Sequence, residues 1–203
     1  MDDLDTLTRM AASVLRGGAA GLRAEGVACI EAFRSLTELP VIGLIKKDDV
    51  NGDVYITPDF ASARAVKEAG ADVIALDCTR RRLREAEPWP ELIRRIHEEL
   101  GRLVCADIAT IDDAVAAQDA GADAVASTLY GYTPETAGKR TVSWTLVETL
   151  IERMAIPVIV EGHITQPEEV RRALEMGANS VVVGSAITRP ESITARFVRA
   201  AAS

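Results

Sequence analysis

The sequence predicts an α/β protein built on an all-parallel sheet, and three observations support this prediction. Short apolar segments alternate with helical patterns at roughly 20 to 35 residues per unit, as in repeated βα units. Three copies of a repeat place a glycine, a small residue and Asp or Asn before an apolar run: EAGADVIALD (68–77), DAGADAVAST (119–128) and EMGANSVVVG (175–184). Aromatic residues make up only 4% of a chain that is 48% hydrophobic, which indicates an aliphatic interior.

The expected strands are of two kinds, which alternate along the chain. One kind follows the glycine repeat, of which RGGAAGLRAEG (16–26) is a looser fourth copy. The other kind is introduced differently, in LPVIGLIKK (39–47), GRLVCADIAT (101–110) and IPVIVEG (156–162). Seven strands can be placed, centred near Arg23, Leu44, Ile74, Ala106, Val125, Ile159 and Val182.

Helical patterns fill the segments between the strands. A first helix is expected over roughly residues 5–15, and later ones in PDFASARAVKEAG, PWPELIRRIHEELG, TIDDAVAAQDAG and QPEEVRRALEMG. Several open on Pro, Thr or acidic residues, which suit a helix N-terminus, and each of these later ones ends at a glycine.

This alternation predicts a TIM (β/α)8 barrel that lacks its first strand, as one domain over residues 1–203. A closed barrel needs eight strands, and the alternation places the eighth before the first helix, where the sequence begins. A doubly wound open sheet is the alternative, but it usually shows a glycine-rich dinucleotide turn after its first strand, and this sequence has none.

Charge and cysteine content restrict the partners. A formal net charge of -8 would repel phosphate backbones and predicts no nucleic acid partner. Three scattered cysteines and two histidines exclude the common zinc spacings and favour a reducing compartment, so we expect no metal. The N-terminus MDDLDTLTRM is no signal peptide, and no run approaches the ~18 apolar residues of a membrane span. We expect a cytoplasmic protein without a membrane partner.

Polar residues gather at the carboxyl ends of the expected strands, where this fold has its chemistry. Each could have a purely structural role, such as capping a helix or forming an ion pair. Acids and bases that converge on one face instead favour an active site. The residues at these ends are Arg23, Glu25, Lys46, Lys47, Asp77, Asp107, Ser127, Thr128, Glu161, Gly184 and Ser185.

The last two strands carry a phosphate signal. Gly162 and Gly184, with Ser185, would let backbone N–H groups approach an anion, although Gly184 could also serve only a tight turn. Arg189 lies just beyond, where it could contact the anion or remain solvated. Tyr132 lies in a loop that could cover a sugar or form only surface. The basic run TRRRLR (79–84) is interpreted as a solvated loop, one arginine of which could face an anionic ligand.

The motifs GLRAEG, VIGLIK, YITP, IALDCT, ADIAT, GYTP, VEGHI and VVVGSAITRP, in this order, resemble the N-acetylmannosamine-6-phosphate 2-epimerases from about residue 9 to residue 198. The resemblance implies an isomerase of sialic acid or aminosugar catabolism that inverts C2 of this aminosugar phosphate and gives N-acetylglucosamine 6-phosphate, without a cofactor. It implies proton transfer by Lys46 and Glu161, and sugar contacts by Arg23 and Asp107. Thr128 and Tyr132 are added as substrate contacts from their positions. The phosphate would be held by Gly162, Gly184, Ser185 and Arg189.

The chemistry of Lys46 depends on its surroundings. A hydrogen beside a carbonyl carbon is weakly acidic, so its removal needs a positioned base and stabilisation of the developing charge. Burial behind VIGLI would lower the pKa of Lys46 and make it a base, whereas a nearby Glu161 would raise that pKa, and the net effect is left open. Lys47 points the other way along the strand and is expected at the surface.

Two further questions stay open. Members of the resembled family begin with an extra strand that carries a polar substrate contact, so either the start is placed too far downstream, as we favour, or the barrel is truncated and has exposed edges. We expect this chain to be poorly stable or weakly active. The alternative function is a catalytically weak phosphosugar-binding barrel; a pentose-phosphate epimerase would need metal-binding histidines at its strand ends. A homodimer is also left open.

Overall fold

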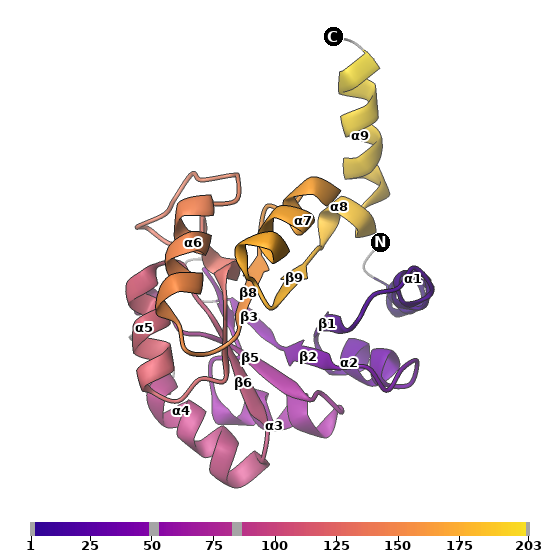
Figure 1. The fold of residues 1–203 in the computed structure, drawn as a ribbon. Coiled ribbons are helices and arrows are strands. Elements are labelled where there is room, and N and C mark those ends of the chain that lie inside the picture. The colour runs from indigo at the N-terminus through magenta and orange to yellow at the C-terminus, as the bar shows by residue number, and fades with distance from the viewer. Residues whose placement is uncertain (1–2, 49–52, 83–86, 202–203) are drawn as a thin grey trace.

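The computed structural model describes residues 3–48, 53–82 and 87–201. Within them, seven parallel strands form a nearly closed barrel in the order β1-β2-β5-β6-β7-β8-β9 (Figure 1). The strands are β1 (Leu22–Glu25), β2 (Val41–Leu44), β5 (Val73–Asp77), β6 (Leu103–Asp107), β7 (Ala124–Ala126), β8 (Val158–Glu161) and β9 (Ser180–Val182). Every predicted strand centre lies inside one of them, so the barrel prediction is confirmed. Between β1 and β9, within these ranges, there is no pairing.

Helices cover the outside of this barrel (Figure 1). They are α1 (Leu4–Arg16), α2 (Val27–Arg34), α3 (Phe60–Glu68), α4 (Trp89–Arg95), α5 (Ile111–Asp119), α6 (Trp144–Arg153), α7 (Pro167–Met176), α8 (Ser185–Thr188) and α9 (Pro190–Ala201). Helix N-caps are present where the sequence predicted helix starts: Asp59 caps α3, and Thr110 forms a capping box on α5. Helix α9 projects away from the barrel. Among the described helices, none has the length and apolar character needed to cross a bilayer.

The glycine repeat has the same structure in its three copies. Its glycines, Gly70, Gly121 and Gly177, have φ values of 100°, 96° and 110°, which is the left-handed conformation that ends a helix. The acidic or amide side chain two residues later accepts a hydrogen bond from a backbone N–H at the start of the preceding barrel strand. The pairs are Asp72 with Val41, Asp123 with Val104 and Asn179 with Val158, at 2.9, 2.7 and 2.9 Å. The repeat thus ties each glycine-led strand to its neighbour.

Side-chain alternation along the strands positions the site. On β6, Val104 and Ala106 pack outward among the helices, whereas Cys105 lies in a second apolar cluster with Ala126 and Ile159. The next residue on the same face as Cys105 is Asp107, and the next after Ile159 is Glu161. The barrel interior is therefore apolar along the strands and charged at their carboxyl ends.

The segment 39–47, predicted as one strand, is divided in two. Strand β2 ends at Leu44, and Lys46–Asp48 forms β3, which pairs antiparallel with β4 (Val54–Ile56) as a separate hairpin. The prediction of a single strand was wrong because Ile45 leaves the barrel: its carbonyl accepts from Thr57 N–H at 2.7 Å, and its N–H donates to Thr57 Oγ1 at 3.3 Å. The hairpin therefore projects from the barrel end and carries Lys46.

Candidate active site

Side chains from separate strands meet at the carboxyl end of the barrel. Arg23 Nη2, from β1, donates to Asp107 Oδ2 of β6 at 2.6 Å, and Arg23 Nη1 lies 3.0 Å from Glu161 Oε2 of β8. Thr128, in the 3₁₀ turn after β7, donates from Oγ1 to Asp107 Oδ1 at 2.6 Å. The side chains of Arg23, Asp107 and Glu161 are only 9%, 0% and 15% exposed. We predicted from the sequence that these residues converge on one face of the barrel, and they contact one another there.

This buried cluster leaves two atoms without a hydrogen bond. In the described part of the chain, neither Arg23 Nη1 nor Glu161 Oε2 has a hydrogen-bond partner. They approach each other as an ion pair, without the geometry of a hydrogen bond. Buried polar groups are usually hydrogen-bonded, and exceptions gather at functional sites. One donor and one acceptor in the middle of the cluster are therefore held only by their mutual ion pair, and a bound molecule could supply the hydrogen bonds that they lack.

Burial changes the protonation of the two acids. It raises the pKa of Glu161 from 4.5 to about 7; Arg23 opposes this shift, and the charge of Asp107 adds to it. Burial also raises the pKa of Asp107, again against the effect of Arg23. Asp107, however, accepts hydrogen bonds from both Arg23 and Thr128, which stabilise an ionised carboxylate. We therefore assign the negative charge to Asp107 and the proton, near neutral pH, to Glu161.

The raised pKa of Glu161 predicts a pH-dependent stability. A folded pKa of about 7, above the ordinary 4.5, means that this contribution is full below pH 4.5 and is lost as the pH rises through 7. Relative to Glu161→Gln, the wild type should lose up to about 3 kcal/mol of unfolding free energy between pH 5 and pH 8. Thermal unfolding across that range measures it. The exposed Glu31 provides the control, since Glu31→Gln should follow the wild type, and parallel curves for Glu161→Gln would contradict the assignment.

The backbone of Glu161 is held by Ser127, which the sequence placed at a strand end without a specific role. Ser127 Oγ donates to the Glu161 carbonyl at 2.9 Å and accepts from its N–H at 3.1 Å. Gly162 has φ 94°, and His163 follows with φ 60°, a conformation that is uncommon for a residue with a side chain. Strain of this kind tends to cluster at functional sites. The positive φ of Gly162 also explains why a glycine is needed there.

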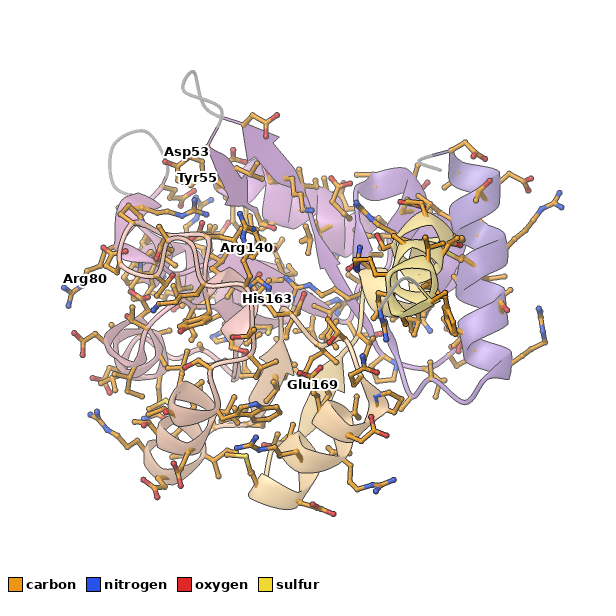
Figure 2. All side chains as sticks on the ribbon, turned by 90° about the horizontal axis from the view of Figure 1, so that it is seen from above. Asp53, Tyr55, Arg80, Arg140, His163 and Glu169 are labelled. Atoms are coloured by element: carbon orange, nitrogen blue, oxygen red, sulfur yellow. The ribbon has the colours of Figure 1, made fainter. Side chains whose placement is uncertain are left out.

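Tyr132 packs against the turn formed by Gly162 and His163. Its ring stacks on His163 with centroids 5.6 Å apart and an interplanar angle of 7°, and it is 53% exposed. His163 Nε2 lies 3.0 Å from the carbonyl oxygen of Tyr130. In Figure 2, which looks onto the molecule from above, His163 lies toward the middle of the view. The loop that carries Tyr132 is thus anchored to the turn after Glu161, and its contact with a sugar stays a prediction.

Lys46 differs from expectation in one respect. The residue is exposed, so the prediction that it is buried was wrong, because the hairpin has already left the barrel at this point. Its backbone N–H donates to Glu25 Oε1 at 3.4 Å, and its ammonium group is among the charges that lower the pKa of Glu161. Lys46 therefore lies close enough to the Arg23, Asp107 and Glu161 cluster for its charge to affect Glu161. Lys47 is also exposed, as predicted, and pairs with Asp59 at 2.6 Å.

The predicted phosphate residues follow two adjacent parallel strands. Glu161 of β8 is in register with Val182 of β9, so Gly162 and Gly184 come just after paired strand ends. Gly184 caps the short helix α8, whose first residue is Ser185, and Arg189 follows its last turn. All of these are partly or fully exposed, and their contact with a phosphate stays a prediction.

Candidate metal ligands do not cluster here. Across residues 3–48, 53–82 and 87–201, there is no group of three or more His, Cys, Asp or Glu side chains that could hold a metal ion. Cys78 and Cys105 are buried, and Cys29 is partly so. Of the basic run 79–84, residues 83–84 lie outside the described part, and Arg81 turns inward instead of toward solvent.

Comparison with known proteins identifies the family. Residues 7–203 match the model of a family described as putative N-acetylmannosamine-6-phosphate epimerase. The chain belongs to this family. A putative N-acetylmannosamine-6-phosphate 2-epimerase of Clostridium perfringens is 43% identical over 93% of this chain and 85% of its own length. One of Clostridioides difficile is 44% identical over 95% and 86%.

Solved structures agree with membership in this epimerase family. The N-acetylmannosamine-6-phosphate 2-epimerase from Clostridium perfringens superposes with a TM-score of 0.91 at 41% identity, over 98% of this chain and 86% of that one. A thiamine phosphate pyrophosphorylase from Pyrococcus furiosus reaches a TM-score of 0.62 at 16% identity, over 92% of this chain and 81% of its own, which supports the barrel fold alone.

Proposed function

We propose that this protein interconverts N-acetylmannosamine 6-phosphate and N-acetylglucosamine 6-phosphate. Family membership supports the substrate, and the observation that carries the chemistry is the buried Arg23, Asp107 and Glu161 cluster, in which two ion-paired atoms lack a hydrogen bond. The two sugars differ only in the configuration at C2. The reaction therefore needs a proton to leave one face of C2 and a proton to arrive at the other.

Lys46 and Glu161 are the groups that we assign to these two proton transfers. Glu161 can deliver a proton because its pKa of about 7 leaves a large fraction of the carboxyl group protonated near neutral pH. Lys46 is the group that we assign to proton transfer at the other face. Because the reaction is reversible, the two residues exchange roles in the opposite direction. This assignment leaves each residue ready for the reverse reaction after one turnover.

Arg23 is placed to stabilise the charge that develops when C2 loses its proton. That charge spreads to the oxygen on the neighbouring carbon, and a buried cationic donor stabilises it strongly. Arg23 Nη1 is such a donor and has no hydrogen bond of its own. Asp107 fixes the guanidinium through Nη2, and Thr128 fixes Asp107 in turn. We assign the phosphate to the backbone at Gly162 and Gly184, with Ser185 and Arg189.

Deuterium incorporation tests this proposal. In heavy water, the wild-type protein should place deuterium at C2 of N-acetylmannosamine 6-phosphate, and NMR should follow both the exchange and the formation of the second sugar phosphate. Binding of the sugar phosphate without exchange would overturn the epimerase and support a barrel that only binds phosphosugars. Absence of both binding and exchange would reject either function.

A homodimer is our proposal for the assembly, and a cytoplasmic location stays a prediction. Phe197 and Val198 on α9 are 72% and 62% exposed, and Phe197 also lines a groove of about 370 Å³ together with Ile187 and Val183. A second copy would cover this apolar surface. Sedimentation should give twice the chain mass, and Phe197→Asp should reduce it to one chain. A wild-type protein that sediments as a monomer would contradict this proposal.

A further inference from the structure

Arg81 joins three parts of the barrel mouth. It lies in the short turn Arg80–Arg82 after β5, and its side chain is only 13% exposed. Nη2 donates to the carbonyl of Val54 on β4 at 2.9 Å and lies 3.1 Å from the buried Asp77 Oδ2 at the end of β5. Nη1 donates to the carbonyl of Tyr132 at 3.3 Å. One guanidinium group therefore connects a strand end, the hairpin and the loop after β7.

A ring contact adds to these bonds. The guanidinium carbon lies 5.3 Å from the centre of the Tyr55 ring, within the range of a cation–π interaction. Tyr55 pairs with Lys47 across the hairpin, one position from the pair of Lys46 with Ile56. Arg81 thus contacts β4, the strand that pairs with the Lys46-bearing strand β3. Figure 2 shows Tyr55 beside Asp53 on this side of the mouth.

Arg80, the adjacent arginine, shows that charge alone does not explain this arrangement. Its side chain is 72% exposed and reaches Asp112 at 3.3 Å, where Asp112 is 67% exposed. In Figure 2 it points outward at the edge of the molecule. Exposed pairs of this kind contribute little. Arg81 instead contacts several groups around its planar guanidinium at once. An ammonium group cannot make such a set of contacts.

We propose that Arg81 is a positioning residue that holds the β3–β4 hairpin against the barrel and thereby places Lys46 beside the Arg23, Asp107 and Glu161 cluster. It acts through the hairpin and through the Tyr132 loop. The effect of Arg81 on activity rests on the function proposed for Lys46, whereas its effect on the hairpin does not. Misplacing a catalytic group by about 1 Å can cost about 100-fold in rate, so a change at Arg81 should be visible in turnover.

Two substitutions separate the hairpin contact from the charge. Arg81→Lys keeps a cation beside Asp77 but cannot reach Val54 and Tyr132 together, whereas Arg81→Ala removes every contact. In Arg81→Lys we expect kcat for C2 exchange to fall about 10- to 100-fold, with a smaller rise in KM because Arg81 also holds the loop of Tyr132, a predicted sugar contact. Arg80→Ala is the matched control and should keep wild-type kcat, KM and melting temperature.

Backbone hydrogen exchange of residues 46–48 and 54–56 provides a readout that does not depend on activity. Arg81→Lys and Arg81→Ala should speed this exchange about 10-fold or more while β5 and β6 stay protected, and Arg80→Ala should not. Unchanged hairpin protection in both Arg81 variants would overturn the proposal, as would an equal loss in Arg80→Ala. If the wild type lacks C2 exchange but the hairpin loosens as expected, the proposed reaction fails and the positioning role stands.

Discussion

Lys46→Ala should slow deuterium exchange at C2 of N-acetylmannosamine 6-phosphate by about 1000-fold, a loss typical for removal of a general base. The lysine faces the Glu161 carboxyl group closely enough to change its pKa, and it belongs to a hairpin that is tied to the barrel at Ile45 and Thr57. Because Lys46 is exposed, its removal leaves no cavity in the core, and the melting temperature should stay near that of the wild type.

The adjacent lysine provides the control for this experiment. Lys47→Ala removes the same charge from the same hairpin, together with an exposed ion pair to Asp59, and should keep C2 exchange close to the wild-type rate. Lys46→Arg keeps a positive charge that cannot serve as a base and should be almost as slow as Lys46→Ala. Normal exchange in Lys46→Arg would show that the residue supplies only charge. An equal loss in Lys47→Ala would point to damage of the whole hairpin.

The barrel could be predicted from the sequence because its signals are local and repeated. Each helix end at Gly70, Gly121 and Gly177 needs a left-handed residue, and each following Asp or Asn bonds to the preceding strand. Period-two alternation then places Asp107 and Glu161 on the interior face. The convergence of the charged cluster follows from these two rules alone.

The hairpin and the behaviour of Arg81 could not be predicted in this way. The run VIGLIKK has no turn residue at Ile45, and the chain leaves the barrel there because of a partner at Thr57, distant in sequence. Arg80 and Arg81 are neighbours of the same residue type, yet the side chain of Arg80 is exposed and that of Arg81 is mostly covered and pairs with Asp77. The raised pKa of Glu161 likewise depends on the burial of its side chain beside Asp107, which comes from a different strand. Such features arise from contacts between segments, which local patterns do not encode.

Arg23→Met should have the second large effect, because it removes the cation that two buried carboxyl groups share. Breaking a buried ion pair on one side typically costs about 3 to 5 kcal/mol, and Asp107 is fully buried. Without Arg23, the pKa values of Asp107 and Glu161 rise further, so the loss of stability should grow as the pH increases. C2 exchange should also fall by at least about 100-fold, since the donor to the developing charge is gone.

A second substitution distinguishes these two consequences. In Arg23→Met combined with Asp107→Asn, no unpaired charge is left at Asp107, so a substantial part of the lost stability should return, while C2 exchange stays slow. Arg34→Met is the matched control, because Arg34 pairs with the half-exposed Asp72 and should affect stability less and exchange hardly at all. Recovery of exchange in the double variant would show that Arg23 serves the fold alone. Recovery of stability without exchange would show instead that balancing the buried acids is not enough for the reaction, which also needs the charged pair of Arg23 and Asp107.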